Sequence, residues 1–169
     1  QARGYYWVDR RLPDGKQARV IVLNTSESTL ADPLIPKLQR GALYPSLSGE
    51  QFDWLRSTLV GAQADDSVAL ALVFGHYPLM EVTVNRTGKR SDRNASYGQV
   101  AQLLGEFPKV NSYFCGHLHS GGPPVQHRFG NHVVVEHVIP SLQEFPKCFG
   151  FASVRKNPVS GEYAVGIKY

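Results

Sequence analysis

Three short apolar runs constrain the fold of this chain more than any other feature of its sequence. They are residues 19–24 (RVIVLN), 68–74 (VALALVF) and 111–115 (NSYFC). Apolar runs of this length that do not alternate with polar residues are typical of strands buried on both faces, as in parallel sheets. The sequence therefore predicts a sheet in which these three runs are buried strands.

Helical patterns separate the apolar runs. Residues 48–51 (SGEQ) form a capping box, and apolar residues follow it at helical spacing, which predicts a helix over about 49–62. A shorter helix is predicted over 97–106, where the apolar residues are Val100, Leu103 and Leu104.

The last third of the chain has the pattern of antiparallel hairpins. Residues 125–129 and 133–139 flank the turn Gly130-Asn131, and residues 149–155 and 163–168 flank a second turn region. A further strand is predicted at 5–9, whereas 25–47 and 81–96 are expected to be loops. The predicted fold class is α/β: one domain with a mixed sheet, helices on one face and C-terminal antiparallel hairpins.

Charge and composition exclude several classes of function. The net charge is +4, but the basic residues form no dense cluster and are not interleaved with aromatic residues, so no nucleic-acid binding is predicted. No apolar run reaches 18 residues, so no membrane span is predicted. Two cysteines, Cys115 and Cys148, are too few for a disulfide-built scaffold. A bridge between them and a buried free thiol at Cys115 are both open, and the free thiol is favoured.

Histidines follow two of the apolar runs at the point where each run ends. His76 lies one glycine after residues 68–74, and His117 and His119 follow residues 111–115 in the motif Gly-His-Leu-His. Ligands of open α/β sheets gather beyond the carboxyl ends of the strands, so these three imidazoles are expected to meet in one crevice. Imidazole is a common ligand of zinc, iron, copper and nickel, which makes the three histidines candidate metal ligands.

The segments around these histidines resemble motifs of the calcineurin-like metallophosphoesterases. Residues 73–79 (VFGHYPL) resemble the family's V-x-G-H-x-P segment, and residues 113–119 (YFCGHLH) resemble its closing G-H-x-H motif. Weaker matches are VLNT at 22–25, SGEQFDWL at 48–55 and Pro140-Ser141. By this resemblance the chain is identified as the C-terminal half of one metallophosphoesterase domain, which is half of an α/β sandwich.

The resemblance implies a metal-dependent phosphoester hydrolase, either a phosphomonoesterase or a phosphodiesterase. Its cofactors would be two divalent metal ions of the manganese, iron or zinc kind. His76 and His117 would bind one metal and His119 the other, and a metal-bound hydroxide would attack the phosphorus of the substrate.

The carboxylate-bearing motifs of the family have no counterpart in this chain. These motifs are D-x-H, G-D-x-x-D and G-N-H, and they stand before the two histidine motifs in the family. Gly130-Asn131-His132 spells the third motif but follows the others, and it is predicted to be a hairpin turn. The chain alone is therefore expected to be inactive and to associate with a missing N-terminal half or a second chain.

Residues close to the first histidine are candidates for contacts with substrate. Arg86 and Arg90 could bind a phosphorylated group, since guanidinium pairs well with phosphate, and the alternative is a solvated polar loop. Tyr77 could touch substrate or pack in the core. Asn85 and Asn94 begin N-glycosylation sequons, which favour slightly a secreted or lumenal protein.

Two other functions are compatible with the same residues. A truncated or degenerate family member could be a non-catalytic binding or scaffolding module. A small domain unrelated to the family could hold a single metal on the three histidines. Carboxylate motifs in a longer parent protein would favour the enzyme over both alternatives.

Overall fold

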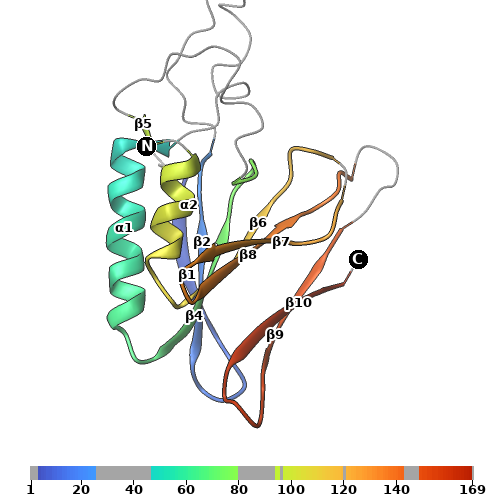
Figure 1. Ribbon diagram of the computed structural model, residues 1–169. Helices are drawn as coiled ribbons and strands as arrows, with labels where there is room; N and C mark the ends of the chain where they lie inside the picture. Colours follow the sequence, from blue (N-terminus) through green and yellow to red (C-terminus); the bar gives the residue numbers. More distant parts are fainter. Residues whose placement is uncertain are drawn as a thin grey trace, which may run out of the picture.

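A six-stranded mixed sheet forms the body of the molecule (Figure 1). The computed structural model describes residues 4–25, 47–79, 94–95, 97–119, 121–142 and 149–168. The strand order is β1-β2-β4-β6-β8-β7, and β2, β4, β6 and β8 run parallel while β1 and β7 are antiparallel edge strands. Their bounds are β1 Tyr6–Arg11, β2 Gln17–Val22, β4 Val68–Phe74, β6 Val110–Cys115, β7 Val125–Phe129 and β8 His132–Val138. The three apolar runs are neighbouring parallel strands, as predicted.

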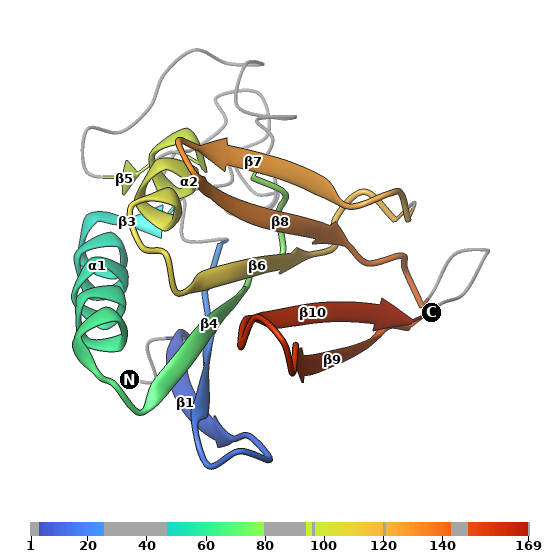
Figure 2. The same cartoon turned by 60° about the horizontal axis from the view of Figure 1, so that its bottom comes forward.

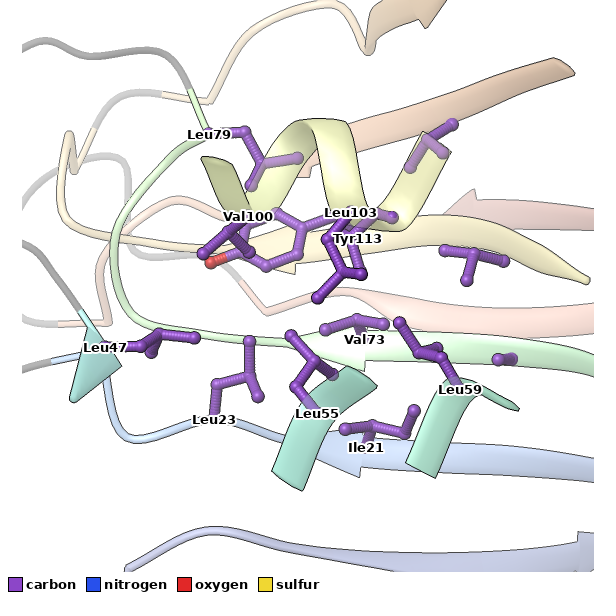
Figure 3. Close-up of a cluster of buried hydrophobic side chains, with 14 of the residues drawn as sticks. Ile21, Leu23, Leu47, Leu55, Leu59, Val73, Leu79, Val100, Leu103 and Tyr113 are labelled. Atoms are coloured by element: carbon purple, nitrogen blue, oxygen red, sulfur yellow. The ribbon is translucent and has the colours of Figure 1, made fainter. Parts of the chain in front are cut away.

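Two helices cover one face of this sheet. They are α1, Gly49–Ala64, and α2, Tyr97–Gly105, and the predicted ends differ from these by at most two residues. The core between helices and sheet is closed by leucine, valine and tyrosine side chains that interdigitate (Figure 3). Burial of each such leucine contributes roughly 1.5–3 kcal/mol. The residues that form this layer include Ile21, Leu55, Leu59, Val73, Val100, Leu103 and Tyr113.

Helix α1 is also tied to the sheet by a polar contact. The side-chain amide of Gln51 accepts a hydrogen bond from Asn24 N at 2.8 Å and donates one to Asn24 O at 3.0 Å. Gln51 is fully buried, and this pairing satisfies both backbone groups of Asn24 just after β2. The capping motif alone does not predict this long-range contact.

The C-terminal hairpin forms a separate two-stranded sheet on the face opposite the helices (Figure 2). Its strands are β9, Phe151–Lys156, and β10, Tyr163–Lys168. Apolar residues of the hairpin, including Val154, Val165 and Ile167, pack on a second buried cluster around Phe114 of the main sheet. The predicted fold class is therefore confirmed, with helices on one face and an antiparallel hairpin on the other.

Two very short strands lie in stretches that the sequence predicts as loops. β3, Leu47–Ser48, pairs antiparallel with β5, Asn94–Ala95, so the loop prediction is wrong for Leu47, Asn94 and Ala95. These strands form because two segments far apart in the sequence pair with each other, which a local sequence pattern does not predict. Residues 26–46 and 80–93 lie outside the described residues.

The hairpin that joins β7 to β8 turns at Gly130-Asn131, between the paired residues Phe129 and His132. Gly130 has a φ of 61°, a left-handed conformation that glycine adopts at little cost. The Gly-Asn-His sequence at 130–132 is therefore a turn, as predicted.

Among the described helices, neither has the length and hydrophobicity needed to cross a bilayer. Cys115 is a buried free thiol, while Cys148 lies outside the described residues, as do Arg86, Arg90 and the sequon at Asn85.

Candidate functional site

The two histidine-bearing loops leave adjacent parallel strands at the same edge of the sheet. Phe74 at the end of β4 pairs with Phe114 on β6, so Gly75-His76 and Gly116-His117 start side by side. Gly116 N donates to His76 O at 3.0 Å, and the imidazoles of His76 and His117 have centroids 5.3 Å apart. The sequence-predicted meeting of the two loops is therefore present in the structure.

The backbone of the first loop is fixed by the end of β2. The hydroxyl of the buried Thr25 accepts hydrogen bonds from His76 N at 2.9 Å and from Tyr77 N at 3.4 Å. Gly75 lies so close to Tyr113 Oη and Thr25 Cγ2 that a methyl group at this position would overlap both. Glycine is needed here because only its backbone can approach these side chains.

The second loop has an unusual backbone. His117 has a φ of 66° and His119 a φ of 57°, both in the left-handed region. Residues with a Cβ adopt this region at a cost of about 1 kcal/mol or more, and such residues cluster at functional sites. Two strained histidines in a three-residue motif indicate that the placement of these imidazoles matters more than the local backbone energy.

Electrostatics favours neutral imidazoles at this edge. Burial lowers the pKa of His76, and the nearby His119 lowers it further. Burial also lowers the pKa of His117, with additional contributions from His76 and His119. Neutral imidazole is the form that binds metals, so the lowered pKa values of His76 and His117 favour the ligand form of these two side chains.

The described residues supply only part of what a dinuclear site needs. No group of three or more His, Cys, Asp and Glu side chains that could hold a metal ion occurs within them. Two dications are normally bridged and neutralised by carboxylates, which three imidazoles cannot replace. The role of His76, His117 and His119 as metal ligands therefore stays a prediction, and it requires further ligands.

Tyr77 is placed in the core rather than at an open surface. Its side chain is 2% exposed, burial raises its pKa, and its ring packs against His117 with centroids 4.3 Å apart. This location supports packing, which is one of the two roles that the sequence allows.

A pocket of about 290 Å³ opens beside both loops on the side of the C-terminal hairpin. The backbones of Gly75 and Gly116 line it at the histidine end, and the rings of Phe74 and Phe114 form part of its wall. The pocket is mainly apolar, so it provides space next to the histidines without adding charged ligands.

Sequence reasoning missed Glu136, which is fully buried on β8 and contacts the His76 loop and the end of β6 just before the His117 loop. A signal was present, because the alternation along 132–138 places Glu136 on the same face as Val134. An acidic residue at an inward position of a strand needs a structural or functional partner.

Comparison with known proteins adds information on the fold. No protein-family model matches the sequence, and no curated protein does. Among solved structures, a dimetal phosphatase from Danio rerio matches with a TM-score of 0.50 and 14% identity, over 95% of this chain and 54% of that chain. Calcineurin-like phosphoesterase YfkN from Bacillus subtilis matches with a TM-score of 0.43 and 12% identity, over 97% of this chain and 50% of that chain.

The chain thus spans about half the length of the solved structures it matches. At 14% identity, the similarity to the dimetal phosphatase shows that the two proteins share a fold.

Proposed function

We propose that this chain is part of a metal-dependent phosphoester hydrolase, in which His76, His117 and His119 supply some of the ligands of a dinuclear metal site. The observation that carries the proposal is the meeting of His76 and His117 at the carboxyl ends of β4 and β6. The fold is shared with a dimetal phosphatase, which supports the same reaction class. In this proposal the hydrolase belongs to the calcineurin-like metallophosphoesterases.

The residues around the three histidines would hold and orient the imidazoles that bind metal. When bound, two divalent metals would polarise the phosphoryl group and provide a hydroxide for hydrolysis. The Thr25 hydroxyl fixes the backbone at His76, and burial keeps His76 and His117 neutral. Tyr77 packs against the His117 ring and limits its rotation.

The remaining ligands, we propose, come from polypeptide outside this chain, either another part of the same protein or a second chain. The sheet face opposite the helices supports this, because a two-stranded hairpin cannot cover six strands. On one side of the hairpin Tyr6 is exposed, and Val20 and Val22 are half-buried. On the other side Val133 and Val135 are half-buried. Apolar strand faces of this kind normally pack against another layer.

A non-catalytic binding module is the alternative function. It is favoured by the incomplete ligand set among the described residues. The two candidates differ in the longest parent protein: the enzyme predicts two metals per site, and the module predicts none.

Elemental mass spectrometry and turnover of p-nitrophenyl phosphate and bis-p-nitrophenyl phosphate test the proposal, on this chain and on the longest parent protein. We expect two metals and turnover in the parent, both lost in His119→Ala. His132→Ala, a histidine outside the two loops, is the matched control and should keep both. A parent with neither metal nor turnover would overturn the hydrolase and leave the binding module.

A further inference from the structure

Glu136 is fully buried on β8, and it contacts the loop that carries His76 and the last residue of β6, the strand that leads to His117. Its Oε1 accepts a hydrogen bond from Leu79 N at 2.6 Å and from Cys115 Sγ at 3.5 Å. Leu79 lies three residues after His76, and Cys115 lies two residues before His117. One carboxylate oxygen therefore joins the loop after β4 to the end of β6, from which the second histidine loop starts.

The other carboxylate oxygen has its own partner. His127 on the neighbouring strand β7 has its Nε2 2.6 Å from Glu136 Oε2. A carboxylate only accepts hydrogen bonds, so His127 carries a proton on Nε2. Burial of a carboxylate without such partners would be costly, and this pairing makes the buried position of Glu136 possible.

The thiol of Cys115 is buried next to the carboxylate. Its Sγ lies 3.5 Å from Glu136 Oε1 and 3.7 Å from His137 O. Glu136 thus accepts hydrogen bonds from three different elements: the loop after β4, the strand β6 and the edge strand β7.

The topology makes this contact informative. β8 is adjacent to β6 but not to β4, so the bond to Leu79 connects the loop after β4 to a strand with which β4 does not pair. The core between the helices and the sheet could be filled at this point by an apolar residue, as it is at Val134. A buried acid that bridges two loops is costly for packing alone but well suited to fixing one loop against the other.

We infer that Glu136 is a positioning residue, which fixes the His76 loop relative to the His117 loop and is itself held by His127. The consequence for metal binding rests on the proposed function. The fixed distance between His76 and His117 does not rest on the proposed function, because this distance can be measured in the metal-free chain.

Amide hydrogen exchange of the 169-residue chain by NMR tests the inference directly. Glu136→Leu removes every acceptor and keeps an inward side chain of similar size. We expect Leu79 to lose protection at least about tenfold beyond any global change, since a hydrogen bond to a charged group is lost. The contact between the His76 and His117 rings should weaken in the same variant. Glu136→Gln keeps a neutral carbonyl acceptor but loses the charge, so Leu79 should lose less protection than in Glu136→Leu but more than in Val134→Ala.

Val134→Ala is the matched control, because it destabilises the same strand and face without touching the carboxylate. Val134→Ala should lower amide protection evenly across the sheet, and the loss of protection at Leu79 should not exceed the loss at its neighbours. If Glu136→Leu does not fold, Glu136→Gln decides, because it must lower protection at Leu79 more than Val134→Ala does.

Unchanged protection at Leu79, or an unchanged contact between His76 and His117, would overturn the inference. Zinc titration of the parent protein, followed by calorimetry, separates the inference from the proposed function. Zinc binding in the parent that weakens about tenfold or more in Glu136→Leu supports both. A parent that binds no zinc and carries no other metal by elemental mass spectrometry overturns the proposed function, and the amide and ring measurements then decide the inference alone.

Discussion

The imidazole of His137 lies nearly flat on the ring of Phe114, with centroids 5.0 Å apart and 17° between the planes. Phe114 stacks in turn on Phe74 at 4.6 Å and 14°. The three rings come from register-paired positions of β4, β6 and β8, so they form one stack across the parallel strands. His137 is 5% exposed, and neither of its ring nitrogens has a partner among the described residues.

His137→Phe should stabilise the isolated chain, because it removes two unsatisfied buried nitrogens and extends the stack on Phe114. The free energy of unfolding in urea should rise by about 1 kcal/mol. His127→Phe is the matched control: the same change removes the partner of the buried Glu136 and should lower stability. Equal effects of the two variants would contradict the account of His137.

The stability of the chain should also depend on His137 as the pH is lowered. Burial lowers the pKa of His137 in the folded state, so the unfolded state binds the proton more readily. The stabilising contribution is complete above the unfolded pKa of about 6.5 and is lost as the pH falls through the lower folded pKa. Urea unfolding between pH 8 and pH 5 should therefore show a smaller loss of stability in His137→Phe than in the wild type.

Asp9→Asn should lower the free energy of unfolding by a large amount for a residue of the edge strand β1. Arg19 is 7% exposed, and its guanidinium donates to both carboxylate oxygens of Asp9 at 2.8 and 2.9 Å, beneath the ring of Trp7. Losing this carboxylate leaves Arg19 with only the longer ion pair to Asp65, at 4.0 Å, and should lower the free energy of unfolding in urea by about 2–3 kcal/mol. The loss is smaller than for a wholly buried pair because Asp9 is partly exposed.

Glu106→Gln is the control for the ion pair. Glu106 accepts from Arg56 at the same distance of 2.9 Å, but their side chains are 45% and 47% exposed. Its loss should cost less than about 1 kcal/mol. A similar effect for both substitutions would show that burial does not decide the strength of these pairs.

Gly75→Ala should destabilise the chain by about 1–3 kcal/mol, because the new methyl group must displace Tyr113 Oη and Thr25. The hydrogen bond from Tyr113 Oη to Tyr77 O, at 2.7 Å, should be lost with it. Thermal unfolding measures the effect, and Gly122→Ala, where the added methyl meets no atom within 4 Å, should leave the midpoint nearly unchanged.

His119→Gly should give a more stable chain than His119→Ala by about 1 kcal/mol, because glycine adopts the left-handed backbone of this residue without strain. The order should be reversed at His132, which lies in a strand where glycine is unfavourable. Denaturant unfolding of the four variants tests both orders. Greater stability of alanine at position 119 would mean that the loop does not store strain there.

The sequence was most informative where local pattern and final structure coincide. The bounds of β4 agree with the uninterrupted run at 68–74, and the helix α2 agrees within one residue. The sequence predicts strands at 5–9 and 19–24, whereas β1 lies at Tyr6–Arg11 and β2 at Gln17–Val22. Their ends are set by pairing across the turn where Leu12 N donates to Lys16 O, which extends the ladder into polar residues.

The two histidine loops meet as the sequence predicts, but the contacts that support them were not predicted, and the role of the histidines as metal ligands stays a prediction. The order strand, glycine, histidine predicts that the imidazoles meet. It does not predict the left-handed backbone of His117, the bond from His76 N to Thr25, or the bridging role of Glu136. Each of these depends on contacts between residues far apart in sequence, which no local periodicity records.

The crossover from β4 through α2 to β6 has a consequence for the assembly of the site. It brings His76 and His117 together within residues 68–117 of one chain. The paired loops can therefore exist before any other polypeptide arrives. A partner that brings carboxylates would meet a prearranged half of the site, and the ordering of these loops would not slow its association.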